Sequence, residues 1–125
     1  MALAKSRVLI VEDEPNIMES LAFILQRADF DIDTATDGTE ALRQLRRRTY
    51  SALILDLMLP GISGLEVLRS VRSDKALETM PVIVLSAKGQ AADRKAAEAT
   101  GATVFITKPF SNSEVVDRVR ELTGG

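Results

Sequence analysis

The stretch 51–64, SALILDLMLPGISG, places a single carboxylate, Asp56, at the end of an apolar run and shortly before a Pro-Gly break. A short apolar run bounded by turn-forming residues is typical of a strand that is covered on both faces of a sheet. An isolated ionised carboxylate is costly to bury, so a residue such as Asp56 is usually paired, bound to a metal ion or reactive. The rest of the sequence distinguishes between these alternatives.

The composition is that of an ordinary globular chain with a mostly aliphatic core. The 125 residues suit one domain, with 46% apolar, 27% charged and 4% aromatic residues. The net charge of −2 gives no bulk reason to bind nucleic acid or an anionic membrane. Neither a signal peptide nor an apolar stretch of about 20 residues is found, so we expect a cytoplasmic protein with no membrane contact.

The sequence contains no cysteine and no histidine. Their absence excludes disulfides, thiol nucleophiles, histidine general bases and the usual zinc sites. Any chemistry must therefore depend on carboxylates, hydroxyls, lysine and a hard metal ion.

Short apolar runs rich in β-branched residues alternate five times with segments of helical periodicity. The runs lie at 7–11, 31–35, 52–55, 82–85 and 103–107. Four of them are continuously apolar, as in a parallel sheet buried on both faces, whereas 31–35 alternates with polar residues and is expected at a sheet edge. The alternation predicts an α/β fold with a doubly wound, five-stranded parallel sheet and five helices.

The helical segments differ in the apolar area that they can bury. The first has a core-facing stripe that includes Leu21 and Leu25, and the last begins at the capping-box pattern 111–114. In the fourth, within 91–100, the apolar residues are alanines, which favour a helix but bury little area. We expect this helix to be held less tightly, either because it covers a shallow part of the sheet or because its position can shift.

Reactive residue types follow four of the predicted strands. Glu12 and Asp13 follow the first, Asp56 the third, Ser86 the fourth and Lys108 the fifth. The carboxyl ends of parallel strands meet at one edge of an open sheet, which is where ligands bind. We therefore expect these five side chains to converge, although they are far apart in the sequence.

Such a convergence requires positive charge. Two carboxylates about 4 Å apart repel each other by about 4 kcal/mol at an effective dielectric constant of about 20. Lys108 supplies one positive charge, which the charges of Glu12, Asp13 and Asp56 outnumber. An all-oxygen site of this kind suits Mg²⁺ better than zinc, so the sequence predicts a magnesium site of modest affinity.

A magnesium site of this kind gives Asp56 a chemical role. Carboxylates can act as nucleophiles in phosphoryl transfer, which also needs positive charge or donors at the oxygens of the transferring group. Mg²⁺, the Lys108 ammonium and the Ser86 hydroxyl would provide these. The sequence contains no G-x-G-x-x-G or Walker pattern, and the acidic loop after the first strand would repel a bare phosphate.

Taken together, the motifs resemble those of the receiver domain of two-component response regulators, including the chemotaxis regulators, over essentially all 125 residues. The motifs are VEDEP at 11–15, LDLMLPG at 55–61 with Gly64, LSA at 85–87 and FITKPF at 105–110. Each alone is weak, but together and in this order they are specific. The resemblance implies a flavodoxin-like sheet of order 2-1-3-4-5 and a single receiver domain over 1–125, with an ordered core of about 5–122.

The resemblance also implies a set of roles. Asp56 would accept a phosphoryl group from the phosphohistidine of a sensor histidine kinase or a histidine phosphotransfer protein. Mg²⁺ would be bound by Asp13, by Asp56 and by the backbone carbonyl of Met58, with Glu12 acting mainly through water. Ser86 and Phe105 would form a switch pair: the hydroxyl moves to the phosphoryl group and the ring turns inward behind it.

Further expectations concern output. Phosphorylation would change the binding of an unknown effector or output domain through the fourth helix, fifth strand and fifth helix. The resemblance also implies a cis Lys108-Pro109 bond, and Met58 and Lys88 would tune the lifetime of the phosphoryl group. Winged-helix members usually carry two acids that form dimer salt bridges at the positions of Thr103 and Val104, so phosphorylation-dependent homodimerisation stays open.

These residues also admit other interpretations. A carboxylate-nucleophile phosphatase usually has a second acid two residues after its nucleophile, where this chain has Met58. A receiver-like domain that no longer takes phosphate is a further alternative, as is a simple structural role for Asp56 at a strand end. The run 46–48, three arginines, is best interpreted as a solvated helix end, with a nucleic-acid contact as the minor alternative.

Overall fold

A computed structural model of the chain describes residues 5–87 and 91–124. Five parallel strands form one sheet in the order β2-β1-β3-β4-β5. The strands are β1 (Arg7–Val11), β2 (Asp31–Ala35), β3 (Ala52–Asp56), β4 (Val82–Ala87) and β5 (Val104–Lys108). The predicted fold class, strand order and edge position of 31–35 are confirmed.

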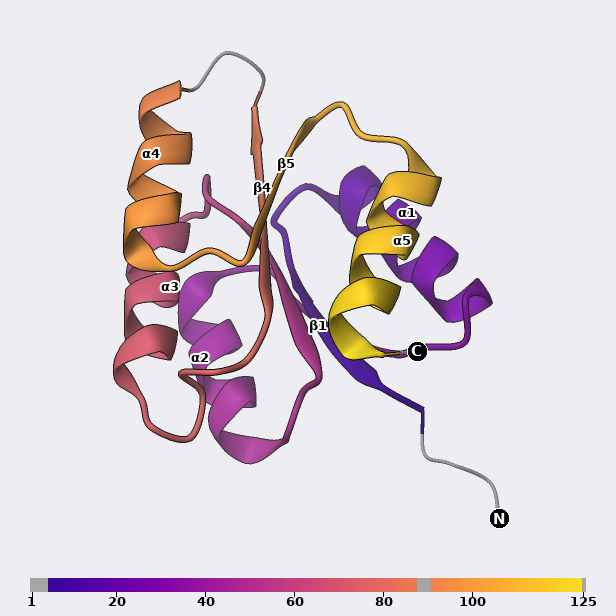
Figure 1. Cartoon of the computed structure of the whole chain (residues 1–125), viewed down its shortest axis with the longest axis horizontal. Coiled ribbons are helices and arrows are strands. Elements are labelled where there is room, and N and C mark those ends of the chain that lie inside the picture. Colours follow the sequence, from indigo (N-terminus) through magenta and orange to yellow (C-terminus); the bar gives the residue numbers. More distant parts are fainter. Residues whose placement is uncertain (1–4, 88–90, 125) are drawn as a thin grey trace.

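Five helices cover the two faces of the sheet (Figure 1). They are α1 (Pro15–Arg27), α2 (Gly38–Arg47), α3 (Gly64–Ser73), α4 (Ala91–Thr100) and α5 (Asn112–Thr123). Helices α1 and α5 pack over one face, and α2, α3 and α4 pack over the other, each group with its own cluster of buried aliphatic residues. None of the helices in the described part of the chain is long and apolar enough to cross a membrane.

The strands extend further toward the site than the sequence predicts. Asp56 is the last residue of β3, Ser86 lies inside β4, and Lys108 is the last residue of β5. Pairing continues this far because Asp56 is in register with Leu85, and Ala87 with Lys108. The reactive residues therefore lie on regular, paired backbone rather than on the loops that follow, which limits their freedom of movement.

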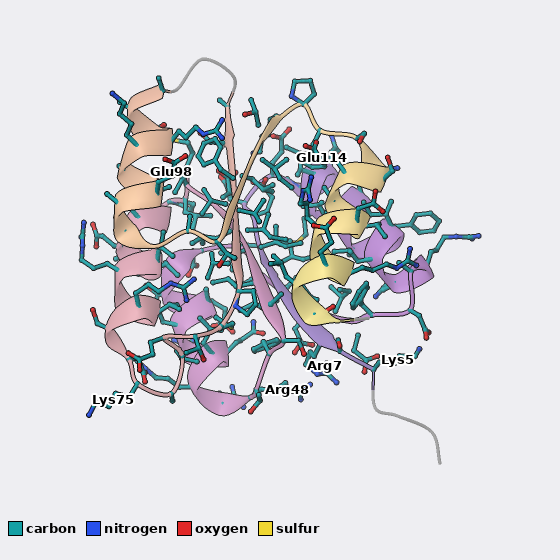
Figure 2. All side chains as sticks on the ribbon, in the orientation of Figure 1. Lys5, Arg7, Arg48, Lys75, Glu98 and Glu114 are labelled. Atoms are coloured by element: carbon teal, nitrogen blue, oxygen red, sulfur yellow. The ribbon has the colours of Figure 1, made fainter. Side chains whose placement is uncertain are left out.

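The arginines at the end of α2 lie at the opposite end of the sheet from Asp56. The side chains 46–48 are exposed, and the Arg48 guanidinium lies 3.5 Å from the Asp33 carboxylate. Figure 2 shows Arg48 at the same edge as Arg7, the first residue of β1. This placement fits a solvated helix end.

Helix α4 is the most lightly buried of the five. Its one buried residue is Ala97, as expected for a helix whose apolar residues are alanines. Its C-terminal end is nevertheless well fixed, because the backbone N–H groups of Gly101 and Ala102 both donate to the Ala97 carbonyl. The light burial of α4 thus goes together with a firmly closed C-terminal end.

The fixed end of α4 is braced by Arg72 from α3. Its guanidinium donates to the carbonyls of Gly101 at 2.9 Å, Met80 at 2.7 Å and Glu78 at 3.0 Å, and to the Thr103 hydroxyl at 3.1 Å. All four acceptors are neutral, and burial lowers the pKa of Arg72. One side chain thus ties the end of α3 to the loops that precede β4 and β5.

We predict that Arg72→Met lowers the free energy of unfolding by about 2–4 kcal/mol, because it removes four hydrogen bonds from a charged donor and leaves their acceptors unpaired. Urea unfolding measures the change. Arg69→Met, at an exposed position of the same helix, is the control and should change the free energy by less than about 0.5 kcal/mol. Equal effects of the two substitutions would contradict the brace.

Candidate phosphoacceptor and metal site

The Lys108 ammonium bridges two buried carboxylates at the carboxyl edge of the sheet. Its Nζ lies 2.7 Å from Asp56 Oδ2 and 3.0 Å from Glu12 Oε1. Asp56 is 3% exposed and Glu12 1% exposed. Each ion pair joins residues from different strand ends, so the convergence predicted for these three side chains is what the structure shows.

Backbone groups fix the other oxygens of the two acids. The Met58 N–H donates to Asp56 Oδ1 at 2.9 Å, and the Glu14 N–H donates to Glu12 Oε2 at 3.2 Å. Gly64 packs closely on the backbone at the end of β3, where a Cβ atom would lie 2.6 Å from Leu57 Cα and would also meet the Asp56 carbonyl oxygen. Gly64, quoted above only as part of a motif, is therefore needed for this close approach to the backbone of Asp56 and Leu57.

Burial and the close packing of charges shift the pKa values of Glu12 and Lys108. Burial, together with the neighbouring Asp56 carboxylate, raises the pKa of Glu12 from 4.5 to about 7, although Lys108 acts in the opposite direction. Burial alone would lower the pKa of Lys108, but its hydrogen bonds to Asp56 and Glu12 outweigh this and raise the pKa. Lys108 is therefore fully charged at neutral pH. The raised pKa of Glu12 means that, without a metal ion, the state in which all the acids of the cluster are ionised is disfavoured.

The residues present fit a magnesium ion. Glu12, Asp13 and Asp56 each offer a carboxylate oxygen, and these oxygens lie within 4.8 Å of one another. Asp13 is exposed, so the group opens to solvent and can accept a partly hydrated ion. The donor set is entirely oxygen and carries more negative charge than Lys108 neutralises, which is the chemistry that Mg²⁺ prefers.

Ser86 and Phe105 lie outside this ion-pair network. The Ser86 side chain is 1% exposed, and its Oγ has no hydrogen-bond partner among the described residues. Phe105 is half-buried on the neighbouring strand and packs against the aliphatic cluster under α2, α3 and α4. The predicted site therefore forms a charged centre, with the hydroxyl and the aromatic ring on the α4 side of the sheet.

An apolar hollow of about 480 Å³ adjoins the charged centre. It lies between α1 and the loop after β5, and its lining includes Ile17, Ala87, Lys108 and Phe110. The Lys108-Pro109 bond in this loop is cis, as the resemblance implied. This hollow gives an approaching macromolecule apolar surface to contact directly beside Lys108.

Two residues of consequence were not found from the sequence. Arg72 has no acid three or four residues away in the sequence, and its four neutral acceptors lie in two loops, one directly after α3 and one about 30 residues away. Arg94 covers the ring of Phe105. The sequence contains a weak signal for Arg94 only, its four-residue spacing from Glu98. Lys88 lies outside the described residues.

Comparison with known proteins agrees with the fold and the site. The model of the response regulator receiver domain matches residues 8–120. The phosphate regulon transcriptional regulatory protein PhoB of Rhizobium meliloti is 39% identical over 116 residues, which are 93% of this chain and 51% of that protein. The chain belongs to the response regulator receiver domain family, and it spans about half the length of the curated relatives that it matches.

Solved structures superpose closely. The signal receiver domain of a signal transduction histidine kinase from Syntrophus aciditrophicus has a TM-score of 0.90 at 31% identity, covering 96% of this chain and 91% of that one. The receiver domain of the sensor histidine kinase PA1611 from Pseudomonas aeruginosa has a TM-score of 0.90 at 26% identity, covering 98% and 100%. That structure has a magnesium ion coordinated in its active site cleft.

Membership of this family defines the chain as a phosphoacceptor signalling module rather than an enzyme that turns over a substrate. Mg²⁺ is the cofactor of the acidic site. This agrees with the donor set formed by the carboxylates at the strand ends.

The raised pKa of Glu12 predicts how metal-free stability depends on pH. Since its pKa is about 7 in the folded chain and near 4.5 when unfolded, the unfolded state loses its proton first as the pH rises. The free energy of unfolding should then fall between about pH 4.5 and 7, by up to about 3 kcal/mol. Chemical unfolding in EDTA at a series of pH values measures this profile.

Glu12→Gln removes the titrating group, so its profile should be flatter over the same pH range. Saturating Mg²⁺ should flatten the wild-type profile too, because bound positive charge favours the ionised carboxylate. Parallel profiles for the two proteins in EDTA would mean that Glu12 titrates normally.

Proposed function

We propose that Asp56 accepts a phosphoryl group from a phosphohistidine and that this modification switches partner binding. The observation that carries the proposal is the buried Asp56 carboxylate, with one oxygen 2.7 Å from the Lys108 ammonium and the acids for a metal around it. The donor would be a sensor histidine kinase or a histidine phosphotransfer protein. The hollow lined by Ile17 and Phe110 offers that donor a docking surface next to the site.

In the transfer, a carboxylate oxygen of Asp56 forms a bond to phosphorus while the N–P bond of the donor phosphohistidine breaks. The electron pair of that bond returns to the imidazole, which takes up a proton, and Asp56 becomes an aspartyl phosphate. When bound, Mg²⁺ supplies positive charge that offsets the charge on the phosphoryl oxygens. We propose that Asp13, Asp56 and the Met58 carbonyl hold it, with Glu12 acting through water.

Lys108 and Ser86 would then stabilise the product. The ammonium, freed from part of its contact with Asp56, can donate to one phosphoryl oxygen. The Ser86 hydroxyl, buried and without a partner in the described structure, would gain an acceptor in another. Filling an unmet hydrogen bond favours the phosphorylated state, and we propose that Phe105 follows Ser86 as the second member of the switch pair.

Turnover as a phosphatase is disfavoured by Met58. This residue stands two positions after Asp56 and is 69% exposed. A thioether neither protonates a leaving group nor orients an attacking water, so we propose that the aspartyl phosphate hydrolyses slowly.

The wider assignments rest on the same proposal. We propose one receiver domain over 1–125 with a core of about 5–122, acting in the cytoplasm. Its output would pass through the face formed by α4, β5 and α5 to an effector or output domain of unknown identity. Phosphorylation-dependent homodimerisation is an alternative output, and the acidic net charge disfavours direct nucleic-acid binding by this domain.

The direct test uses acetyl phosphate with Mg²⁺ and intact-protein mass spectrometry. The wild-type chain should gain the mass of one phosphoryl group, and Asp56→Asn should gain none. Asp117→Asn, an exposed acid on α5, is the matched control and should be modified like the wild type. Modification of Asp56→Asn, or none of the wild type, would refute the assignment of Asp56.

Phosphorylation should also change amide hydrogen exchange over the described part of α4 and β5, residues 91–107. We expect faster or slower exchange there because α4 has one buried residue and little apolar area to resist a shift. The residues of α2, which packs on the same face as α4 but near β1 and β2 at the other edge of the sheet, should show unchanged exchange. Identical exchange across 91–107 in the two states would rule out this face as the output.

A further inference from the structure

The guanidinium of Arg94, on α4, lies over the Phe105 ring. Its Cζ lies 5.2 Å from the ring centroid, a cation–π distance. Its Nε also donates to Glu98 at 3.0 Å, one helical turn further along α4. The ring also packs against the aliphatic cluster beneath α4, so it contacts both the protein core and a guanidinium.

Phe105, Ser86 and α4 share one face of the sheet. Val84 is in register with Phe105 and Ser86 with Thr107, and side chains two residues apart on a strand point to the same face. Figure 2 shows Glu98 on α4 and Glu114 on α5 on opposite sides of β5. Phe105 and the Ser86 hydroxyl, unpartnered among the described residues, therefore lie on neighbouring strands, on the sheet face that α4 covers.

The contact with Phe105 matters because it ties the first half of α4 to β5. The end of the helix is fixed by Arg72, which binds the Gly101 carbonyl. Its one buried residue, Ala97, lies in the second half. Among the described residues, Arg94 provides the cation–π contact between the first half of α4 and β5.

We propose that Arg94 is a positioning residue that holds Phe105 in the resting position and so opposes phosphorylation of Asp56. This inference rests on the function proposed above, and it adds a residue of this chain to that switch. A contact made only in the resting arrangement stabilises that arrangement, because a ring that turns inward leaves the guanidinium behind. Formation of the phosphorylated state then costs the free energy of this contact, because the contact is broken.

A simpler account treats Arg94 as half of an ordinary surface ion pair. Both Arg94 and Glu98 are 58% exposed, and such pairs contribute little to stability. The ion pair alone gives Arg94 no influence on Asp56, whereas the contact with the ring does. The two accounts therefore predict different phosphorylation rates.

The experiment compares Arg94→Gln with Lys95→Gln, which removes the same charge from an exposed neighbouring position. Acetyl phosphate with Mg²⁺ phosphorylates Asp56 as the new O–P bond forms and the bond from phosphorus to acetate breaks, releasing acetate. Arg94→Gln should raise the rate about two- to fivefold, the factor that a surface cation–π contact corresponds to. Lys95→Gln should leave the rate unchanged.

A double-mutant cycle with Phe105→Leu identifies the ring as the partner. In a chain that already carries Phe105→Leu, Arg94→Gln should no longer change the rate. Mg²⁺ affinity should be the same for Arg94→Gln and Lys95→Gln, and their free energies of unfolding should differ by no more than the contact itself contributes, about 0.5–1 kcal/mol. This separates a shift of the switch from a change in the site or the fold. Arg94→Lys should lie between wild type and Arg94→Gln, because an ammonium is more strongly hydrated than a guanidinium.

Three outcomes would overturn the role of Arg94: equal rates for Arg94→Gln and Lys95→Gln, a slower rate for Arg94→Gln, or an effect of Arg94→Gln that persists in full alongside Phe105→Leu. A wild-type chain that takes up no phosphoryl group would instead refute the proposed function. The two failures are therefore distinguishable in the same assay.

Discussion

The Lys108 ammonium between Asp56 and Glu12 is the interaction on which the site depends. It joins the ends of three strands through residues that are 52 and 96 positions apart in the chain. Without it, two buried carboxylates would face each other uncompensated, and one of them would have to take up a proton. Because the positive charge is fixed on the last residue of β5, Asp56 can be buried and still present an oxygen for reaction. The same geometry leaves an excess of negative charge, which gives the site its affinity for a divalent cation.

The cluster could be predicted from the sequence because its formation depends only on the order and direction of the strands. Parallel strands bring their carboxyl ends to one edge, so the residue types at Glu12, Asp56 and Lys108 suffice to predict a cluster. Its finer features depend on backbone geometry. Asp56 and Ser86 belong to the strands rather than to the loops after them, because Asp56 pairs with Leu85 and Ser86 with Thr107. Whether pairing continues for one or two residues more has no clear signature in a single sequence.

The contacts of α4 were harder still to predict from the sequence. Its alanines predicted light burial, and Ala97 is its one buried residue. Its end is fixed by Arg72, which donates mainly to backbone carbonyls. Because every residue has a backbone carbonyl, no pattern of side chains in the sequence predicts this contact. Among the described residues, Arg72 fixes the end of α4, and the helix itself buries little apolar area. A helix of small buried area suits a switch that a small free-energy change has to move.

The central claim is that Asp56, Lys108 and Ser86 act on one phosphoryl group. A crystal structure of the chain with Mg²⁺ and beryllofluoride, which mimics an aspartyl phosphate, tests it most directly. The account predicts beryllium bonded to an Asp56 oxygen, with Lys108 Nζ and Ser86 Oγ each within hydrogen-bond distance of a fluorine and Mg²⁺ bound by Asp13. Beryllofluoride on another carboxylate, or a Ser86 hydroxyl left unpaired beside occupied Asp56, would contradict it.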